Sequence, residues 1–527
     1  MKSSSPNGKT SAIPIWTTFL LLLVIMVSWS VRLRLGSMPL ERDEGEYACM
    51  GQLLLQGVPP YTEAFGMKFP GIYLLYAAIL QFIGQNEVSI RVGLLLANGI
   101  AAIGIFLLGQ RFERDESNDD SPEFFRLVPL GLWMASAFSI LTLAPAMLGI
   151  SANAEHFVLP FVCASMPLLH AAENRRNIFI SGLLLGCAAA VKQQGAAFAL
   201  WGFLWVGMKT FRHPQKSPVF ATLVSMALFG IGFVLPLAVI AIWLKQAGAW
   251  DSFFFWTIQY ARHYGSQWGL RDGMAHFCSQ FAPIARDHAF FFIPVAAGLL
   301  CLFRQRRMEA IFAIGLIGAG LLAASPGLIF RNHYFLFLCP GLAIVFALGF
   351  DIFRARWGQL AAGFICLGLL ISPVMIQFNL LFRLRPEQVC RQLYWRTPFV
   401  EIRQLALQLR SQIPSGEPIA IIGSEPQISF YSGRRSFLPY LYLYPLFEPQ
   451  PFATQMQDDV KARLEKNPPR FLVHIKVPSS WLLYPGSRRD FLDWLPGYLS
   501  KHYTSRSVQT IRSTKFHWEL VVYERRP

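Results

Sequence analysis

The sequence predicts an α-helical protein that crosses a membrane about eleven times and carries a small α/β domain outside that membrane. Three observations predict this architecture. The 527-residue chain is 54% hydrophobic and 15% charged, with a mean hydropathy of +0.39, whereas soluble domains are about one quarter charged. Long apolar runs alternate with short basic loops. After residue 380 the composition changes to turn prolines, more charges and shorter apolar runs.

Eleven apolar runs come close to the ~17 to 25 residues that a membrane-crossing helix needs. They cover residues 13–31, 89–110, 126–147, 156–172, 178–191, 195–209, 218–244, 288–303, 309–325, 333–351 and 359–379. The first run is interpreted as an uncleaved span, because no small-residue cleavage site follows it; a signal peptide is the competing interpretation. The fifth and sixth runs are short and flank "VKQQG". One broken span is therefore an alternative there.

The basic residues predict the orientation. With the N-terminus in the cytoplasm, alternate loops each carry at least two basic residues, in agreement with the positive-inside rule. These loops contain Arg111/Arg114, Arg175/Arg176, Lys209/Arg212/Lys216, Arg304/Arg306/Arg307 and Arg354/Arg356. Merging the fifth and sixth runs would invert every later loop and break this pattern. The topology thus accounts for the net charge of +16, and no nucleic-acid partner is expected.

An odd number of spans places the C-terminus outside the cell membrane, which is the inner membrane in a bacterium. Residues 1–380 are expected to form the transmembrane domain, with long outer loops at 32–88 and 245–287, and residues 381–527 the outer domain. In that domain "PIAIIGS", "FLVHIK" and "WELVVYER" predict strands. "TPFVEIRQLALQLRSQI", "FATQMQDDVKARLEK" and "RDFLDWLPGYLSKHY" predict helices.

Charged residues remain on the outer side of the membrane once the loops are assigned. They are Asp43, Glu44, Glu46, Lys68, Glu155, Lys192, Arg262, Arg271 and Arg331. A single such residue more often snorkels or forms a structural ion pair, but acids and bases from several segments on one side favour a shared functional site. An acid in a low-dielectric cleft gains proton affinity and suits general-base work. Lys and Arg suit a phosphate, here one that belongs to a lipid.

The acids of "ERDEGEY" are expected to differ in role. Asp43 is predicted to carry the chemistry, and Glu44 to contact substrate or a neighbouring base. Glu46 is predicted to be either the partner of a loop arginine or a solvated residue, and Glu41 to be solvated.

Five stretches carry a resemblance to a known family. "RDEGEYACMGQLLLQGVPPYTEAFGMKFPGIYLLYA" has an Asp-Glu pair after the first span, a Tyr three residues on and a downstream Lys-aromatic-Pro. "ISANAEHFVLPF", "AAAVKQQGAAFAL", "FRNHYFLFLCPGLAIVFAL" and "IIGSEPQISFYSGRRS" follow in order. From about residue 38 onward the chain resembles the GT-C superfamily of polytopic glycosyltransferases. Within it, the chain resembles the bacterial members of the clan of dolichyl-phosphate-mannose protein mannosyltransferases and aminoarabinose transferases, similar to glycosyltransferase family 39.

The resemblance implies an inverting hexosyl- or pentosyltransferase that moves a sugar from a polyprenyl-phosphate donor to an acceptor hydroxyl outside the membrane. It implies Asp43 as base or orienter of that hydroxyl and Glu155 as the second acid. It implies Lys68 and Arg331 as ligands of the donor phosphate. Supporting roles are assigned to Glu44, Glu46, Tyr47, Lys192, His263, His333 and Tyr334. Because inversion needs base and leaving group on opposite faces of the sugar, Asp43 is expected across the sugar from Lys68 and Arg331.

Metal dependence is the first open point. Some relatives bind a metal through a Glu just before the first-loop lysine and a histidine of the later outer loop. Here Met67 occupies the first position, so no metal site is predicted, with a divalent ion held through His263 as the alternative.

The acceptor and the functional class are the other open points. The acceptor is a glycolipid, a glycan or a protein, and the outer domain either guides it or is a packing lid. A membrane transporter and a non-catalytic GT-C-like scaffold are the alternative functions. The charges at one membrane face, with no visible inverted repeat, disfavour a transporter. The presence of Asp43, Glu155 and Lys68 disfavours an inactive scaffold.

Overall fold

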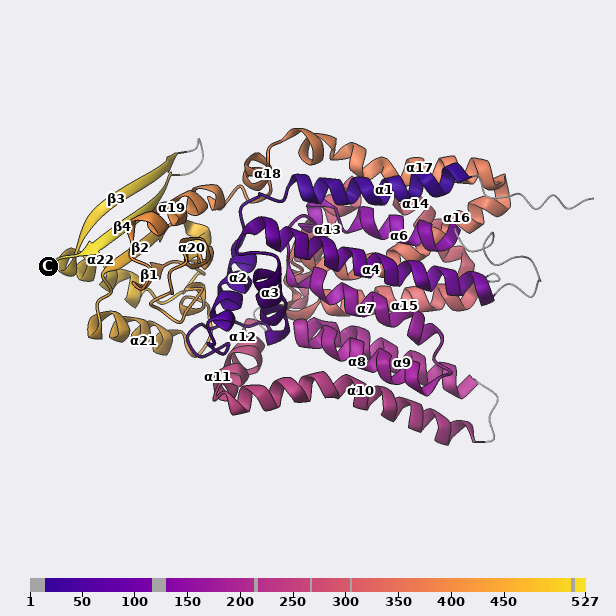
Figure 1. Cartoon of the computed structure of the whole chain (residues 1–527), viewed down its shortest axis with the longest axis horizontal. Coiled ribbons are helices and arrows are strands. Elements are labelled where there is room, and N and C mark those ends of the chain that lie inside the picture. The colour runs from indigo at the N-terminus through magenta and orange to yellow at the C-terminus, as the bar shows by residue number, and fades with distance from the viewer. Residues whose placement is uncertain (1–14, 116–128, 213–216, 266–267, 304–305, 513–516) are drawn as a thin grey trace, which may run out of the picture.

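The computed structural model describes residues 15–115, 129–212, 217–265, 268–303, 306–512 and 517–527. Lys216 and Arg304 of the basic loops lie outside these residues. A bundle of long helices makes up one part of the molecule, and a smaller α/β domain packs against one end of it (Figure 1). Several short helices lie between the two parts.

A helix lies in each of the eleven expected segments. The bundle helices are α1 (Ile15–Arg34), α4 (Glu87–Asp115), α6 (Pro129–Leu141), α7 (Ala154–His170), α8 (Arg175–Val191), α9 (Ala196–Arg212), α10 (Pro218–Gln246), α14 (Phe292–Leu299) continued by η4 (Leu300–Phe303), α15 (Arg307–Ala324), η6 (Asn332–Leu338) continued by α16 (Cys339–Trp357), and α17 (Gln359–Ile376).

Six of these helical segments are long and apolar enough to cross a membrane: α1, α4, α10, α15, η6 with α16, and α17. A seventh is counted if α13 (Leu270–Asp287) and α14 with η4, bent by 103°, form one broken span. The other four expected spans are shorter, because α7, α8 and α9 have 17 residues each and α6 has 13. The described residues thus make a multi-pass membrane protein, with six or seven spans by this measure and four further short helices.

The fifth and sixth runs form two separate helices. Helices α8 and α9 pack against each other and are joined by the short turn η2 (Gln193–Gly195). A Cβ atom on Gly195 would lie 2.6 Å from the carbonyl carbon of Ala188, so the turn requires glycine. Arg175 begins α8, and Lys209 and Arg354 lie near the C-terminal ends of α9 and α16.

Short helices connect the bundle to the outer domain. They are α2 (Arg42–Leu55), α3 (Pro70–Phe82), α11 (Trp250–Phe254), the π-helix η3 (Phe255–Tyr260) and α12 (Ala261–Tyr264). Helix α2 begins with a capping box, in which the side chains of Glu41 and Glu44 each accept from the other's backbone N–H. Glu41 is therefore a buried N-cap, and the expectation that it is solvated was wrong.

The outer domain contains a four-stranded sheet in the order β1-β2-β4-β3. Strand β1 (Ile419–Ile422) pairs in parallel with β2 (Phe471–Lys476), and β4 (His517–Arg525) is antiparallel to both β2 and β3 (Tyr503–Arg512). The three predicted strands are present. Strand β3 was not predicted, because "YTSRSVQTIR" is polar and lies at the edge of the sheet.

Helices and turns complete the outer domain and the connections. The helices are α18 (Pro386–Leu393), α19 (Phe399–Gln412), α20 (Gln427–Ser432), α21 (Ala453–Lys466) and α22 (Asp490–His502). The short turns are η1 (Pro145–Met147), η5 (Pro326–Leu328), η7 (Asn379–Arg383), η8 (Tyr444–Leu446) and η9 (Pro478–Ser480). Helices α19, α21 and α22 correspond to the three predicted helices.

A buried ion pair joins α2 to the bundle. Glu44 of α2 and Arg91 of α4 form a bidentate pair, with side chains 0% and 1% exposed. The same carboxylate accepts from the backbone N–H of Ala152, just before α7, and from that of Glu41. Each oxygen of Glu44 therefore has two donors, which satisfies the condition for a buried charge to be tolerated.

We expect Glu44→Gln or Arg91→Met to destabilise the protein by about 3–5 kcal/mol, because each leaves an uncompensated buried charge or donor. The measurement is the thermal unfolding midpoint of protein purified in detergent. The matched control is Glu63→Gln, which breaks an exposed pair with Arg435, with side chains 52% and 47% exposed. That change should cost less than about 1 kcal/mol. Equal losses in the two pairs would contradict this assignment.

Candidate active site

Five segments bring charged side chains together at the end of the bundle that faces the outer domain. Asp43 lies in the first turn of α2, and Lys68 lies in the loop just before α3. Glu155 is in the first turn of α7, and Lys192 follows α8. The fifth segment holds Arg331, His333 and Tyr334, at the start of η6.

Asp43 and Lys68 form an ion pair with each other. The Lys68 Nζ atom is 3.6 Å from Asp43 Oδ2, and the two side chains are 15% and 22% exposed. The loop that carries Lys68 is held by Tyr61, whose hydroxyl donates to the Lys68 carbonyl at 2.6 Å, and by Gln193, which donates to the Met67 carbonyl. Asp43 and Lys68 are thus in contact, not separated by the width of a sugar as expected.

The surroundings of Asp43 favour its ionised form. Burial raises the pKa of Asp43, but attraction to Lys68 first, and to Lys192 and Arg331 as well, outweighs burial and holds this pKa well below its usual value. His333 acts in the same direction when it is protonated. For the same reason the pKa of Lys68 is raised, since the attraction of Asp43 outweighs the effect of burial. The expected gain in proton affinity is therefore wrong for Asp43 as it stands in the structure.

Glu155 lies at the centre of a second, buried group. It forms an ion pair with Lys192, and His333 Nε2 is 3.8 Å from Glu155 Oε1. The Lys192 Nζ atom lies over the Tyr334 ring, 4.5 Å from its centroid, in the geometry of a cation–π contact. Among the described residues, Glu155 Oε2 is buried and accepts no hydrogen bond.

Glu46 and Tyr47 support the site from α2. Glu46 is 1% exposed and accepts a hydrogen bond of 2.6 Å from the Tyr73 hydroxyl. Neither expected role of Glu46, as the partner of a loop arginine or as a solvated residue, is found. Burial raises the pKa of Glu46, against the opposing effect of Lys68. Tyr47 is buried in edge contact with Tyr76, and Lys68 Nζ is 6.0 Å from the Tyr47 ring centroid.

Glu44 and His263 are engaged elsewhere. Glu44 is enclosed by its bonds to Arg91, Ala152 and Glu41, so its contact is with a base and not with substrate. The His263 ring packs edge-on against Phe452 of the outer domain, with centroids 5.6 Å apart. No group of three His, Cys, Asp or Glu residues that could hold a metal is found in the part of the chain that the structure describes.

Arg331 is the most exposed cation of the cluster. Its guanidinium donates to the Tyr264 hydroxyl at 3.4 Å, and it has no carboxylate partner among the described ion pairs. Arg331 therefore has donors available for an anion beside the Asp43–Lys68 pair.

The outer domain contributes groups that the sequence did not predict. The Tyr442 hydroxyl is 3.2 Å from both Asp43 Oδ1 and the Arg42 carbonyl oxygen. The Arg42 guanidinium donates to the Ser424 carbonyl at 2.6 Å and pairs with buried Glu425 at 2.7 Å. The only sequence signal was the tyrosine-rich stretch "YLYLYP", which does not indicate which tyrosine reaches α2.

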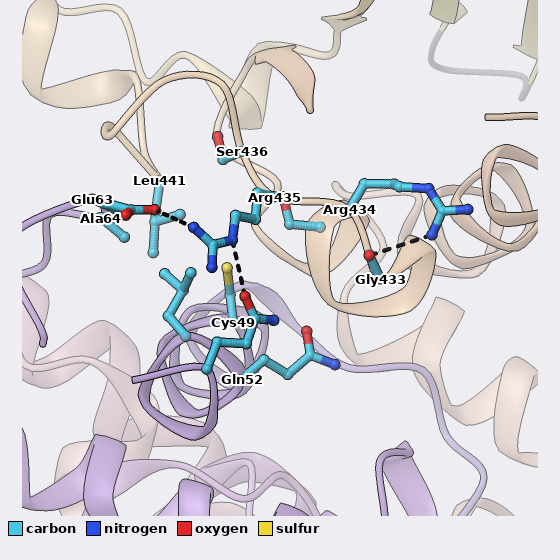
Figure 2. A pocket seen from close by; sticks show the side chains of 12 residues that line it. Cys49, Gln52, Glu63, Ala64, Gly433, Arg434, Arg435, Ser436 and Leu441 are labelled. Atoms are coloured by element: carbon cyan, nitrogen blue, oxygen red, sulfur yellow. Dashed lines mark hydrogen bonds and ion pairs between the residues drawn. The ribbon is translucent and has the colours of Figure 1, made fainter. Parts of the chain in front are cut away.

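The outer domain also holds the loop that carries Lys68. The backbone N–H of Phe65 donates to the Pro439 carbonyl at 2.7 Å. Figure 2 shows Arg435 reaching Glu63 across a pocket lined by the C-terminal half of α2 and the segment after α20. Arg435 also donates to Gln56 at 2.9 Å. The outer domain thus contacts both the helix of Asp43 and the loop of Lys68.

Comparison with known proteins shows similarity at the level of structure. No protein-family model matches the sequence, and no curated protein matches it either. Two crystal structures of ArnT from Cupriavidus metallidurans do match. The one bound to undecaprenyl phosphate has a TM-score of 0.58 at 12% identity, over 96% of this chain and 97% of that chain. The structure of the apo state has a TM-score of 0.56 at 14% identity, over 97% of this chain and 98% of that chain.

At such low identity the likeness shows the fold and nothing more. It extends over the bundle and the outer domain together, because nearly the whole of each chain is covered. The chain therefore has the GT-C fold, as the sequence resemblance predicted.

Proposed function

We propose that the protein is an inverting glycosyltransferase that moves a sugar from a polyprenyl-phosphate donor to an acceptor hydroxyl at the outer face of the membrane. The observation that carries this proposal is the partly exposed Asp43–Lys68 ion pair, with Arg331 close enough to lower the pKa of Asp43. It places one carboxylate next to two cations at the mouth of a membrane bundle. The related fold of ArnT, in a crystal structure with bound undecaprenyl phosphate, supports a lipid phosphate as the ligand of those cations.

Lys68 and Arg331 are the proposed ligands of the donor phosphate. Both are partly exposed and close enough to Asp43 to lower its pKa. Lys192 is less suited to this task, because its ammonium is already paired with Glu155 in a buried contact. We assign Lys192 to holding Glu155 and His333 in place.

Donor binding would change the basicity of Asp43. When phosphate oxygens take over Lys68, Asp43 loses its nearest cation and gains a negative neighbour, and both changes raise its pKa. The same exchange opens a space between Asp43 and Lys68 for the sugar, which gives the geometry that inversion needs. The carboxylate thus becomes a stronger base when the donor is present.

The proposed reaction is a single displacement at the anomeric carbon of the donor sugar. Asp43 accepts the proton of the acceptor hydroxyl while the acceptor oxygen bonds to the anomeric carbon on the face opposite the phosphate. The bond from that carbon to the phosphate oxygen breaks, and polyprenyl phosphate leaves with the bonding pair. Lys68 and Arg331 stabilise the developing charge on the phosphate. Glu155 Oε2, which has no partner among the described residues, is proposed to accept from a hydroxyl of the donor sugar.

The setting of this reaction is also proposed. Residues 1–380 would form the catalytic transmembrane domain and residues 381–527 the extracytoplasmic domain, with the N-terminus in the cytoplasm. The membrane would be the cell membrane, which is the inner membrane in a bacterium. The acceptor would be a glycolipid, a glycan or a protein.

We expect Asp43→Asn to lower turnover by about 10²–10⁴-fold, because it removes the proton acceptor, without lowering the unfolding midpoint. Mass spectrometry of surface glycans and lipids from a strain that lacks the gene names the sugar that is lost. Complementation with the variant then measures the loss. The control is Asp458→Asn on α21, whose 64%-exposed side chain pairs with Lys461. A wild-type glycan profile with Asp43→Asn would refute the proposed function.

We expect Lys68→Gln to weaken undecaprenyl phosphate binding roughly 10- to 100-fold, through loss of a charge-assisted hydrogen bond. It should also move the acid limb of the kcat/KM profile to higher pH. Asp43 acts as a carboxylate, so the rate falls as pH drops through its pKa. Removing the cation that lowers this pKa makes the fall begin at higher pH. Lys461→Gln is the matched control, and an unmoved limb would count against the assigned role of Lys68.

A further inference from the structure

We propose that Tyr442 of the outer domain is a positioning residue for Asp43, which holds Oδ1 so that Oδ2 is the oxygen that takes the acceptor proton. This inference rests on the proposed function. The two oxygens of Asp43 have different partners, since Oδ1 is 3.2 Å from the Tyr442 hydroxyl and Oδ2 is 3.6 Å from Lys68 Nζ. The first partner belongs to the outer domain and the second to the loop before α3.

The two partners differ in whether a substrate can displace them. Lys68 is a cation that a phosphate can attract away from Asp43. The Tyr442 hydroxyl is neutral, is buried and has no comparable attraction to a phosphate. When the donor binds, Oδ2 is therefore released while Oδ1 stays held. The carboxylate keeps its orientation at the moment when its basicity is needed.

Tyr442 is itself held rigidly. The backbone N–H groups of Leu443 and Tyr444 both donate to the Ser424 hydroxyl, at 2.9 and 3.2 Å. The Tyr442 and Tyr444 rings are stacked with centroids 4.9 Å apart. Ser424 also accepts from Arg42 through its carbonyl oxygen, so the segment that carries Tyr442 and the first turn of α2 share one support. Such support is what fixes a reacting group to within a fraction of an ångström.

The single proton of Tyr442 lies among acceptors of α2. Asp43 Oδ1 and the Arg42 carbonyl oxygen are each 3.2 Å from the Tyr442 hydroxyl. A hydrogen bond from the same hydroxyl lowers the pKa of Glu46. Of the two carboxyl groups, Asp43 is the one whose ionised form is favoured, because its pKa is lowered while that of Glu46 is raised. The other charged groups whose fields reach Asp43 or its acidic neighbours are Arg42, Lys68, Lys192, Arg331, His333, Glu41 and Glu46.

The test compares Tyr442→Phe with Tyr440→Phe. Both variants lose one hydroxyl from the same segment and keep the ring. The Tyr440 hydroxyl donates to Asp459 at 3.0 Å, within the outer domain, and serves as the matched control. The substrates are the donor and acceptor that the comparison with the deletion strain identifies, and donor-site binding is measured with undecaprenyl phosphate.

We expect Tyr442→Phe to lower kcat roughly 10- to 100-fold, the loss of one hydrogen bond to a charged group. Binding of undecaprenyl phosphate and the unfolding midpoint should match those of Tyr440→Phe. The acid limb of kcat/KM should move to higher pH, since a hydrogen bond to the carboxylate form lowers the pKa of Asp43. Placing difluorotyrosine at position 442, a stronger donor, should move the limb to lower pH.

Two outcomes would overturn the inference. One is a wild-type kcat and pH profile in Tyr442→Phe. The other is an equal fall in kcat, in undecaprenyl phosphate binding and in the unfolding midpoint, which is the signature of packing alone. If Asp43→Asn is inactive, either result contradicts only the role proposed for Tyr442. Full activity in Asp43→Asn removes the proposed function itself.

Discussion

The buried ion pair between Glu44 and Arg91 fixes the first turn of α2, and the positions of the two acids proposed for the reaction follow from it. Glu44 precludes free rotation of α2 because Arg91 belongs to the long helix α4. Its carboxylate also accepts from Ala152, three residues before Glu155, so one side chain fixes both the helix of Asp43 and the turn that leads into α7. Removing two charges from water is costly, and four donors around Glu44 offset that cost.

The acids of this turn diverge because successive helix positions point about 100° apart. Glu41 caps the helix, Glu44 faces the bundle, and Glu46 faces Tyr73. Asp43 alone keeps a partly exposed carboxylate, beside Lys68. The sequence was sufficient to group the acidic turn with the cations of other segments, because apolar runs and basic loops predict which connections share one end of the bundle, and Lys68 does lie beside Asp43. It was insufficient to predict that Glu46 is buried, because the hydrogen-bond partner of Glu46, Tyr73, lies on another helix.

Other parts of the structure could not be predicted for related physical reasons. Strand β3 has too few apolar residues to be recognised from sequence. It lies at the edge of the sheet, where fewer of its residues need to be apolar. The sign of the pKa change of Asp43 was predicted wrongly, because burial was considered without the cations of three other segments. Tyr442 is about 400 residues from Asp43 in sequence, and neither periodicity nor charge pattern reports a contact at that separation. The membrane bundle, by contrast, follows from local composition.

The outer domain contacts both the loop of Lys68 and the first turn of α2. It hydrogen-bonds the loop of Lys68 through Pro439 and the first turn of α2 through Ser424, while Arg435 joins it to Glu63. A domain that holds both partners of the Asp43–Lys68 pair sets the distance between them. Loss of its contacts would let Lys68 and Asp43 move independently, and the effect of the Lys68 charge on the pKa of Asp43 would then no longer be fixed. The close packing of the bundle and the outer domain thus fixes the distance between Asp43 and Lys68.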